Sequence, residues 1–154
     1  MVIVRRSMAV DADALGFVMY NAIRSGPSRY TEAQRIAWQN QPLAGEKWAI
    51  RLSEQQVWIA EMQGDAVGFL TLDKTGYIDL AFVTAAAQGK GVFSALYDAL
   101  EGAAMEDGPT RLWTHASLMA QPAFEARGFH VIRHETVDRN GEVLARAEME
   151  KALT

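Results

Sequence analysis

Cysteine is absent from this chain of 154 residues. Its absence excludes disulfides, thiolate metal sites and a cysteine nucleophile, and it is compatible with a reducing cytoplasmic location. The chain also lacks an apolar run long enough to cross a bilayer and a cleavable hydrophobic leader after Met1. We therefore expect no membrane association and no export.

Clusters of lysine and arginine are also lacking, and the formal net charge is −4. This balance argues against nucleic acid as the main partner. Hydrophobic residues make up 49% of the chain and charged residues 22%, as in globular proteins. The length predicts a single domain over residues 1–154 with one substantial core.

The most informative stretch reads as strand, loop and helix. Residues 77–83 are rich in β-branched and aromatic side chains, and residues 92–103 repeat apolar side chains at helical spacing. Between them lies Gln88-Gly89-Lys90-Gly91. Glycines at the start of a helix let a ligand approach the free N–H groups of the first turn, which favours a phosphate site.

The same tetrapeptide is also typical of a tight connection without ligand. It is not a Walker loop, because the four-residue gap and the following Lys-Ser or Lys-Thr pair are missing. It is not the dinucleotide fingerprint either, because Ser94 stands where a third glycine or alanine is required.

The other elements follow in order. We predict a strand over 1–6, a helix capped by Asp11, a helix beginning at 30–32 and a short helix or turn over 48–52. Strands over 57–62 and 66–72 form a hairpin and continue antiparallel into 77–83, with a bulge or close approach at Gly68. A strand over 111–115 should run parallel to 77–83. Ser117 is a predicted N-cap, and Asn140-Gly141 predicts a closing hairpin.

Two separated motifs resemble the GNAT N-acetyltransferases. Gln88 to Gly91 matches most of the acyl-CoA loop of that family, although Phe93 replaces its last small residue. Residues 124–129 match its Tyr/Phe-Glu-x-x-Gly-Phe signature. The resemblance covers essentially the whole chain. It implies an α/β (α+β) fold with a mixed, mostly antiparallel sheet of about six to seven strands, about four helices and a splayed parallel pair at the CoA site.

The resemblance also implies which residues bind acetyl-CoA, the expected cosubstrate. They are Phe82, Val83, Gln88, Gly89, Lys90, Gly91, Val92, Phe93, Ser94, Ser117 and Phe124. The irregular region 20–48 corresponds to the part that covers the acceptor. Arg29, Tyr30, Trp38 and Trp48 are the candidates there, with core or rim packing as the alternative for each.

Catalysis requires a group that accepts a proton from the amine. Asp79 and His115 are the candidates, and each could instead be a solvated or a buried structural residue. Phe124 stands where relatives commonly have a tyrosine that protonates the leaving thiolate. His130 and His134 alternate along a predicted surface strand, and no metal site is expected.

We therefore expect an acetyl-CoA-dependent N-acetyltransferase that acts on a primary amine of a small molecule or protein. Without cysteine, transfer should be direct within a ternary complex. One alternative is a CoA-binding sensor or interaction module with little catalysis, which Phe124 favours. Another is an unrelated α/β protein whose glycine loop is only a turn. A homodimer is possible, as among relatives.

Overall fold

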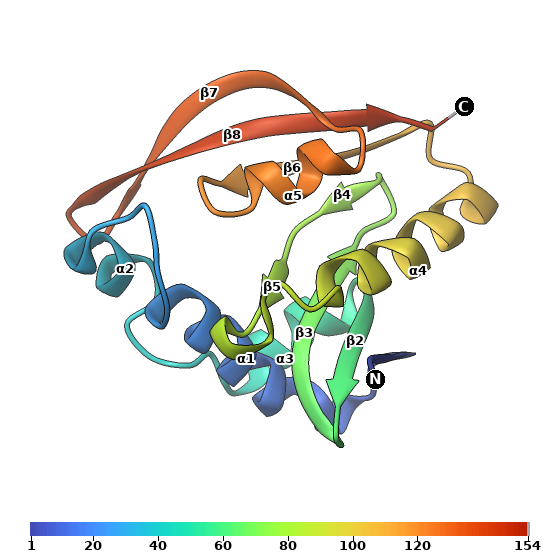
Figure 1. Ribbon diagram of the computed structural model, residues 1–154, viewed down its shortest axis with the longest axis horizontal. Helices are drawn as coiled ribbons and strands as arrows, with labels where there is room; N and C mark the ends of the chain where they lie inside the picture. The colour runs from blue at the N-terminus through green and yellow to red at the C-terminus, as the bar shows by residue number, and fades with distance from the viewer. Residues whose placement is uncertain (154) are drawn as a thin grey trace.

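The computed structural model describes residues 1–153 and shows two four-stranded sheets with helices packed against them (Figure 1). The first sheet has the order β1 (Ile3–Arg6), β2 (Gln56–Met62), β3 (Asp65–Leu72), β5 (Ala81–Val83). The second has the order β4 (Tyr77–Ile78), β6 (Arg111–Ser117), β8 (Glu142–Ala152), β7 (His130–Arg139). The helices are α1 (Ala12–Arg24), α2 (Glu32–Trp38), α3 (Glu46–Ser53), α4 (Val92–Asp107) and α5 (Gln121–Ala126). Short 3-10 turns lie at Ala9–Asp11 and Ala85–Ala87.

The predicted strand over 77–83 is split in two, and this prediction was wrong in one respect that matters. β4 pairs in parallel with β6, as expected for a crossover, whereas β5 pairs antiparallel with β3. At the break, the amide of Leu80 donates to Thr71 Oγ1 at 3.0 Å, and the Leu80 carbonyl accepts from the Thr71 amide at 3.0 Å. The chain thus leaves one sheet and joins the other, so the sheets diverge. The split also brings the strands described to eight rather than six or seven.

The helices pack against two separate apolar cores. α4 and α5 cover one core, which includes Leu96, Leu100 and Phe124, each at most 1% exposed. α1 and α3 cover the other, which includes Leu15 and Trp48. Packing at close-packed density, rather than local preference, therefore sets the position of each helix.

Gly68 has the close approach that the sequence predicts. A Cβ atom at Gly68 would lie 3.0 Å from Val92 Cγ1 and 3.2 Å from Leu96 Cδ1. A side chain there would push the first turns of α4 away from β3. The glycine therefore helps to set the position of the α4 N-terminus.

Two further predictions have opposite outcomes. Asn140-Gly141 does form a two-residue hairpin between β7 and β8, with φ of 48° and 87°. Ser117 is not the N-cap of α5, because β6 continues to Ser117 and the N-cap is Ala120. Ser117 Oγ instead accepts the Ala120 amide at 3.2 Å.

Hydrogen bonds join α2 and the nearby Tyr30 to the long β7–β8 hairpin, which arches over the top of Figure 1. Tyr30 Oη donates to the Ala145 carbonyl, Gln34 Nε2 to the Val143 carbonyl, and Asn140 Nδ2 to the Ala37 carbonyl. These bonds enclose the space between α2 and the second sheet. Across residues 1–153, the helices are too short or too polar for any of them to span a bilayer.

Candidate active site

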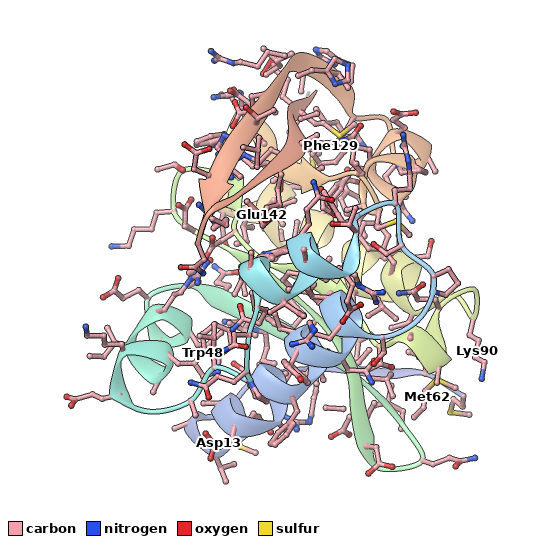
Figure 2. All side chains as sticks on the ribbon, turned by 90° about the vertical axis from the view of Figure 1, so that its left-hand side faces the viewer. Asp13, Trp48, Met62, Lys90, Phe129 and Glu142 are labelled. Carbon is pink, nitrogen blue, oxygen red and sulfur yellow. The ribbon has the colours of Figure 1, made fainter. Side chains whose placement is uncertain are left out.

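A cleft of about 410 Å³ opens between β5 and the start of α4, and we call it the loop cleft. Nine of the predicted cofactor residues line it: Phe82, Val83, Gln88, Gly89, Gly91, Val92, Phe93, Ser94 and Ser117. The other two do not. Lys90 is exposed and points away from the body of the protein (Figure 2), and the buried Phe124 lines a second cavity instead.

The glycine loop leaves open space where an anion would lie. Gly89 and Gly91 have φ of 76° and 80°, and a Cβ at either would meet no atom within 4 Å. Gly91 is the N-cap of the 16-residue helix α4 and makes no side-chain cap, so the first-turn amides have no side-chain acceptor there. Free amides and the helix dipole together favour a phosphate group at this place.

β5 offers main-chain groups to the same cleft. The bonds at Leu80 and Thr84 join β5 to β3, and Phe82 lies midway between them, opposite Phe69. Because antiparallel pairing alternates, the polar groups of Phe82 face β3 and those of Ala81 and Val83 face away from it. Val83 O already accepts Gln88 Nε2 at 3.2 Å. The amides of Ala81 and Val83 are the free donors on this edge.

Arg127 lines the loop cleft and was not predicted. It donates to Ser94 Oγ at 3.0 Å, pairs with Asp98 and lies over the Tyr97 ring. It occupies a variable position of the second motif, residues 124–129, and the sequence gives no sign that its side chain contacts α4. It supplies a positive charge at the loop cleft, which Lys90 does not line.

A second cavity of about 350 Å³, which we call the inner cavity, lies between α1 to α3 and the polar face of the second sheet. It shares a wall with the loop cleft, made of Tyr30, Trp38, Ala81, Phe82, Ser117 and Ala120. A group held in the loop cleft can therefore meet a molecule in the inner cavity at this wall. Two cavities that meet beside free amides suit the transfer of a group between two bound molecules.

Of the predicted acceptor residues, Tyr30 and Trp38 lie on the shared wall, with ring centroids 5.7 Å apart. Arg29 is exposed and lines neither cavity. Trp48 is 3% exposed in the core, where its Nε1 donates to the Ala12 carbonyl at 2.7 Å. Two of these four predicted residues therefore lie on the shared wall.

The hydrogen bonds of the Tyr30 hydroxyl indicate a structural role. Its hydroxyl accepts the Leu118 amide at 2.9 Å and donates to the Ala145 carbonyl at 2.5 Å, so both hydrogen-bonding functions are used. Burial is the main cause that raises the pKa of this phenol. The hydroxyl therefore joins the end of β6 to β8 and is not free to transfer a proton.

We expect Tyr30→Phe to lower the free energy of unfolding by about 1–3 kcal/mol, since it leaves the half-buried Leu118 amide and Ala145 carbonyl without this partner. Chemical denaturation measures the loss. Tyr20→Phe is the control, because Tyr20 makes no hydrogen bond through its hydroxyl among the described residues. Equal stability of both variants would contradict the structural role.

Asp79 lines the inner cavity, but its carboxylate is already paired. Arg51 donates to its two oxygens at 2.9 and 3.0 Å, and Gln55 Nε2 donates at 3.0 Å. A bidentate guanidinium stabilises the ionised carboxylate and occupies the lone pairs that a base would use. Asp79 is thus better placed to hold Arg51 than to take a proton.

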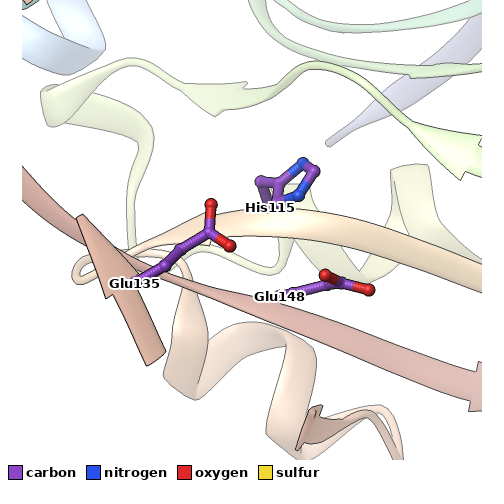
Figure 3. Close-up of side chains that lie close together, drawn as sticks. All are labelled: His115, Glu135 and Glu148. Atoms are coloured by element: carbon purple, nitrogen blue, oxygen red, sulfur yellow. The ribbon is translucent and has the colours of Figure 1, made fainter. Parts of the chain in front are cut away.

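His115 lies on the same face of the sheet, half-buried, with Nδ1 at 2.8 Å from Tyr77 Oη. Burial first, and then the charge of Arg146, lower the pKa of His115. Glu135 and Glu148 approach the ring from β7 and β8 (Figure 3) and act in the opposite direction. The imidazole is therefore neutral at neutral pH, with carboxylates nearby to stabilise an imidazolium.

His115, Glu135 and Glu148 place one ligand atom each within 4.8 Å of one another, which is a spacing that a metal could use. Both carboxylates are already bound by arginine. Arg146 Nε lies 2.7 Å from Glu135, and an Arg133 nitrogen lies 3.0 Å from Glu148. A cation would have to compete with two guanidinium groups, so the cluster fits an ion-pair network better than a metal centre.

Comparisons with known proteins agree with this geometry. A family model described as an acetyltransferase (GNAT) domain matches residues 28–153. The uncharacterized N-acetyltransferase YafP of Escherichia coli K12 is 30% identical over 139 residues, covering 90% of this chain and 87% of its own.

Solved structures give the same result. That of a GCN5-related N-acetyltransferase from Rhodopseudomonas palustris is 34% identical, with a TM-score of 0.88 and coverage of 98% of this chain and 95% of its own. A phosphinothricin acetyltransferase from Sinorhizobium meliloti, solved with AcCoA, has a TM-score of 0.75 over 99% of this chain and 88% of its own. At 18% identity, the second likeness concerns the fold alone.

Proposed function

Since the chain belongs to the GNAT acetyltransferase family, we propose that it transfers the acetyl group of acetyl-CoA directly to a primary amine held in the inner cavity. The shared wall between the two cavities carries this proposal. Acetyl-CoA would lie in the loop cleft, with its pyrophosphate on the α4 N-terminus and its thioester at the wall. The amine would attack from the other side, with no covalent enzyme intermediate.

The developing negative charge on the thioester oxygen needs a donor fixed in advance. Ala81 lines both cavities, and its amide faces away from β3, so we infer that it polarises the acetyl carbonyl. Val83 lines only the loop cleft, and its amide would bond the pantetheine arm. The family resemblance implied that main-chain groups of Phe82 and Val83 hold the pantetheine and polarise the acetyl carbonyl. Because the amide of Phe82 faces β3, we assign the polarising role to the amide of Ala81 instead.

The acceptor must attack as a neutral amine. We infer that His115 accepts its proton, directly or through water, because it lines the inner cavity and its pKa is lowered. This role requires the proton of the neutral ring to be on Nδ1 and donated to Tyr77, which leaves Nε2 with a free lone pair. Asp79 keeps its ion pair with Arg51.

The departing thiolate has no tyrosine to protonate it, since Phe124 has no hydroxyl. Ser117 is on the shared wall, and its Oγ accepts the Ala120 amide, which leaves its own proton to donate. A serine is far less acidic than a thiol, so Ser117 would give the thiolate a hydrogen bond and not a proton. Phe124 also motivates the second candidate, a CoA-binding module with slow turnover.

The test measures release of free CoA from acetyl-CoA with a thiol reagent, with and without a panel of primary amines. Because the protein has no cysteine, every thiol detected belongs to CoA. Amine-dependent release with acetylated product is expected at enzyme-like rates, on the order of 1 per second or faster. Tight binding of acetyl-CoA with release far slower than this would favour the CoA-binding module.

His115→Gln should lower kcat by about 100-fold or more, because bulk water replaces a positioned base. For the wild type, kcat should stay constant as pH falls past about 6.5, the ordinary imidazole pKa, and decline only below it, since the lowered pKa keeps His115 neutral there. The decline should be absent in His115→Gln. His134→Gln, at an exposed position on β7, is the control. An unchanged acid limb in His115→Gln would exclude His115 as the base.

A further inference from the structure

The charges on the inner cavity are unbalanced. Three guanidinium groups line it, those of Arg51, Arg139 and Arg146, against a single carboxylate, that of Asp79. Asp79 forms an ion pair with Arg51. Arg146 forms one with Glu135, which is not in the lining. Arg139 has no carboxylate within ion-pair distance among residues 1–153, and it bonds only to the Asp138 carbonyl at 3.3 Å.

Arg146 is placed at the reacting end of the cavity. It lies directly opposite Ser117 in the β6–β8 pairing, and Ser117 is on the shared wall. Its Nε donates to Glu135, whereas its two terminal nitrogens make no hydrogen bond within the described chain. Those two nitrogens form the planar fork that binds a carboxylate through two parallel bonds.

Among the described residues, the inner cavity has no free carboxylate that could bind a second positive charge on the acceptor. The carboxylate of Asp79 already accepts from Arg51 and Gln55, so no free carboxylate lines the inner cavity. Between the charged groups, the lining combines polar side chains, such as Gln39 and Thr114, with the apolar side chains of Leu43, Val137 and Leu144. A volume of about 350 Å³ is that of a small-molecule site.

Resting on the proposed function, we propose that the acceptor is a small amino-carboxylate, whose anionic group binds Arg146, with Arg139 adding to the positive potential. The amine would then lie at the shared wall, and the apolar part of the molecule against Leu43, Val137 and Leu144. A dicationic amine, such as a polyamine, would meet Arg139 and the terminal nitrogens of Arg146 with no free carboxylate among the described lining residues, and would be rejected. The site therefore selects by the charge of the group that does not react.

The test compares amines that differ only in that second group. One series is 6-aminohexanoate, hexylamine and 1,6-diaminohexane, and a second is L-phenylalanine and 2-phenylethylamine. We expect kcat/KM to be at least about tenfold higher for the carboxylate member of one series than for its neutral partner, and lowest for the diamine. An equal or reversed order, or no acetylation of either carboxylate by a protein that binds acetyl-CoA, would overturn the proposal.

Variants connect the preference to the arginine. Arg146→Gln is combined with Glu135→Gln, so that no carboxylate loses its partner and the net charge stays the same. This double variant should reduce the preference to less than about threefold, and Arg139→Gln should weaken it. Arg111→Gln is the control, because Arg111 pairs with Glu150 and lines neither cavity. A preference that survives in the double variant would overturn the proposal.

A binding measurement separates this inference from the proposed function. Titration calorimetry of N-acetyl-L-phenylalanine and N-acetyl-2-phenylethylamine into the protein alone needs no acetyl-CoA. The acid should bind at least about tenfold more tightly, and the difference should disappear in the double variant. Binding of neither compound, or tighter binding of the neutral one, would refute the anionic acceptor. Failure to bind acetyl-CoA would instead refute the proposed function and leave this comparison valid.

Discussion

Gly91→Trp should raise the Kd for acetyl-CoA at least about 100-fold, or about 2.7 kcal/mol. No atom lies within 4 Å of a Cβ at this position, so the indole would extend into the open space at the α4 N-terminus. In that space the pyrophosphate would accept hydrogen bonds from the amides of the first helical turn. Titration calorimetry with acetyl-CoA measures the change directly.

The same helix supplies a matched control. Gly108 ends α4 with φ of 95° and also has no atom within 4 Å of a Cβ, but it lines neither cavity. Left-handed backbone costs a non-glycine residue about 1–2 kcal/mol, so Gly91→Trp and Gly108→Trp should lose similar stability. Only Gly91→Trp should lose affinity. Equal affinity of the two variants would show that the loop is merely a connection.

Ala81→Pro should reduce kcat by about 100- to 1,000-fold while acetyl-CoA still binds within about tenfold of the wild type. Proline has no amide hydrogen, so the substitution removes the donor that we place at the thioester oxygen. The bonds from β5 to β3 use Leu80 and Thr84, and by alternation Phe82, so no bond of the ladder is lost.

Val83→Pro is the comparison for Ala81→Pro, since it also removes an amide that faces away from β3. Val83 lines only the loop cleft, so this variant should weaken acetyl-CoA binding and change kcat less. Steady-state kinetics with calorimetry distinguishes the two outcomes, and thermal unfolding checks that both variants fold. A loss of kcat in Val83→Pro that equals the loss in Ala81→Pro would show that the donor is not specific to Ala81.

Local features that depend on one or two residues could be predicted from the sequence. Asn140-Gly141 forms its hairpin because both positions adopt positive φ, which these residues tolerate better than others. Gly89 and Gly91 lie at the start of α4 for the same reason, and the crossover between β4 and β6 is parallel. Each of these is decided by backbone sterics or by the length of the connection.

Pairing between distant groups could not be predicted. The sequence of residues 77–83 reads as one strand, yet Leu80 bonds Thr71 and the strand divides between two sheets. Asp79 was a candidate base from the sequence, but in the structure it forms an ion pair with Arg51. Nothing in the sequence indicated that Arg146 lines the inner cavity. Alternation in a strand fixes which side chains share a face, but not which strand or helix that face meets.

The sequence by itself therefore determined the family, the order of elements and the glycine loop, because these depend on short motifs and on periodicity along the chain. Only the tertiary structure decided where the two cavities meet, which amides of β5 stay free, and which charged side chains remain without a partner. Those properties depend on distances between residues far apart in the chain, and the free energy of ion pairs and hydrogen bonds depends steeply on such distances.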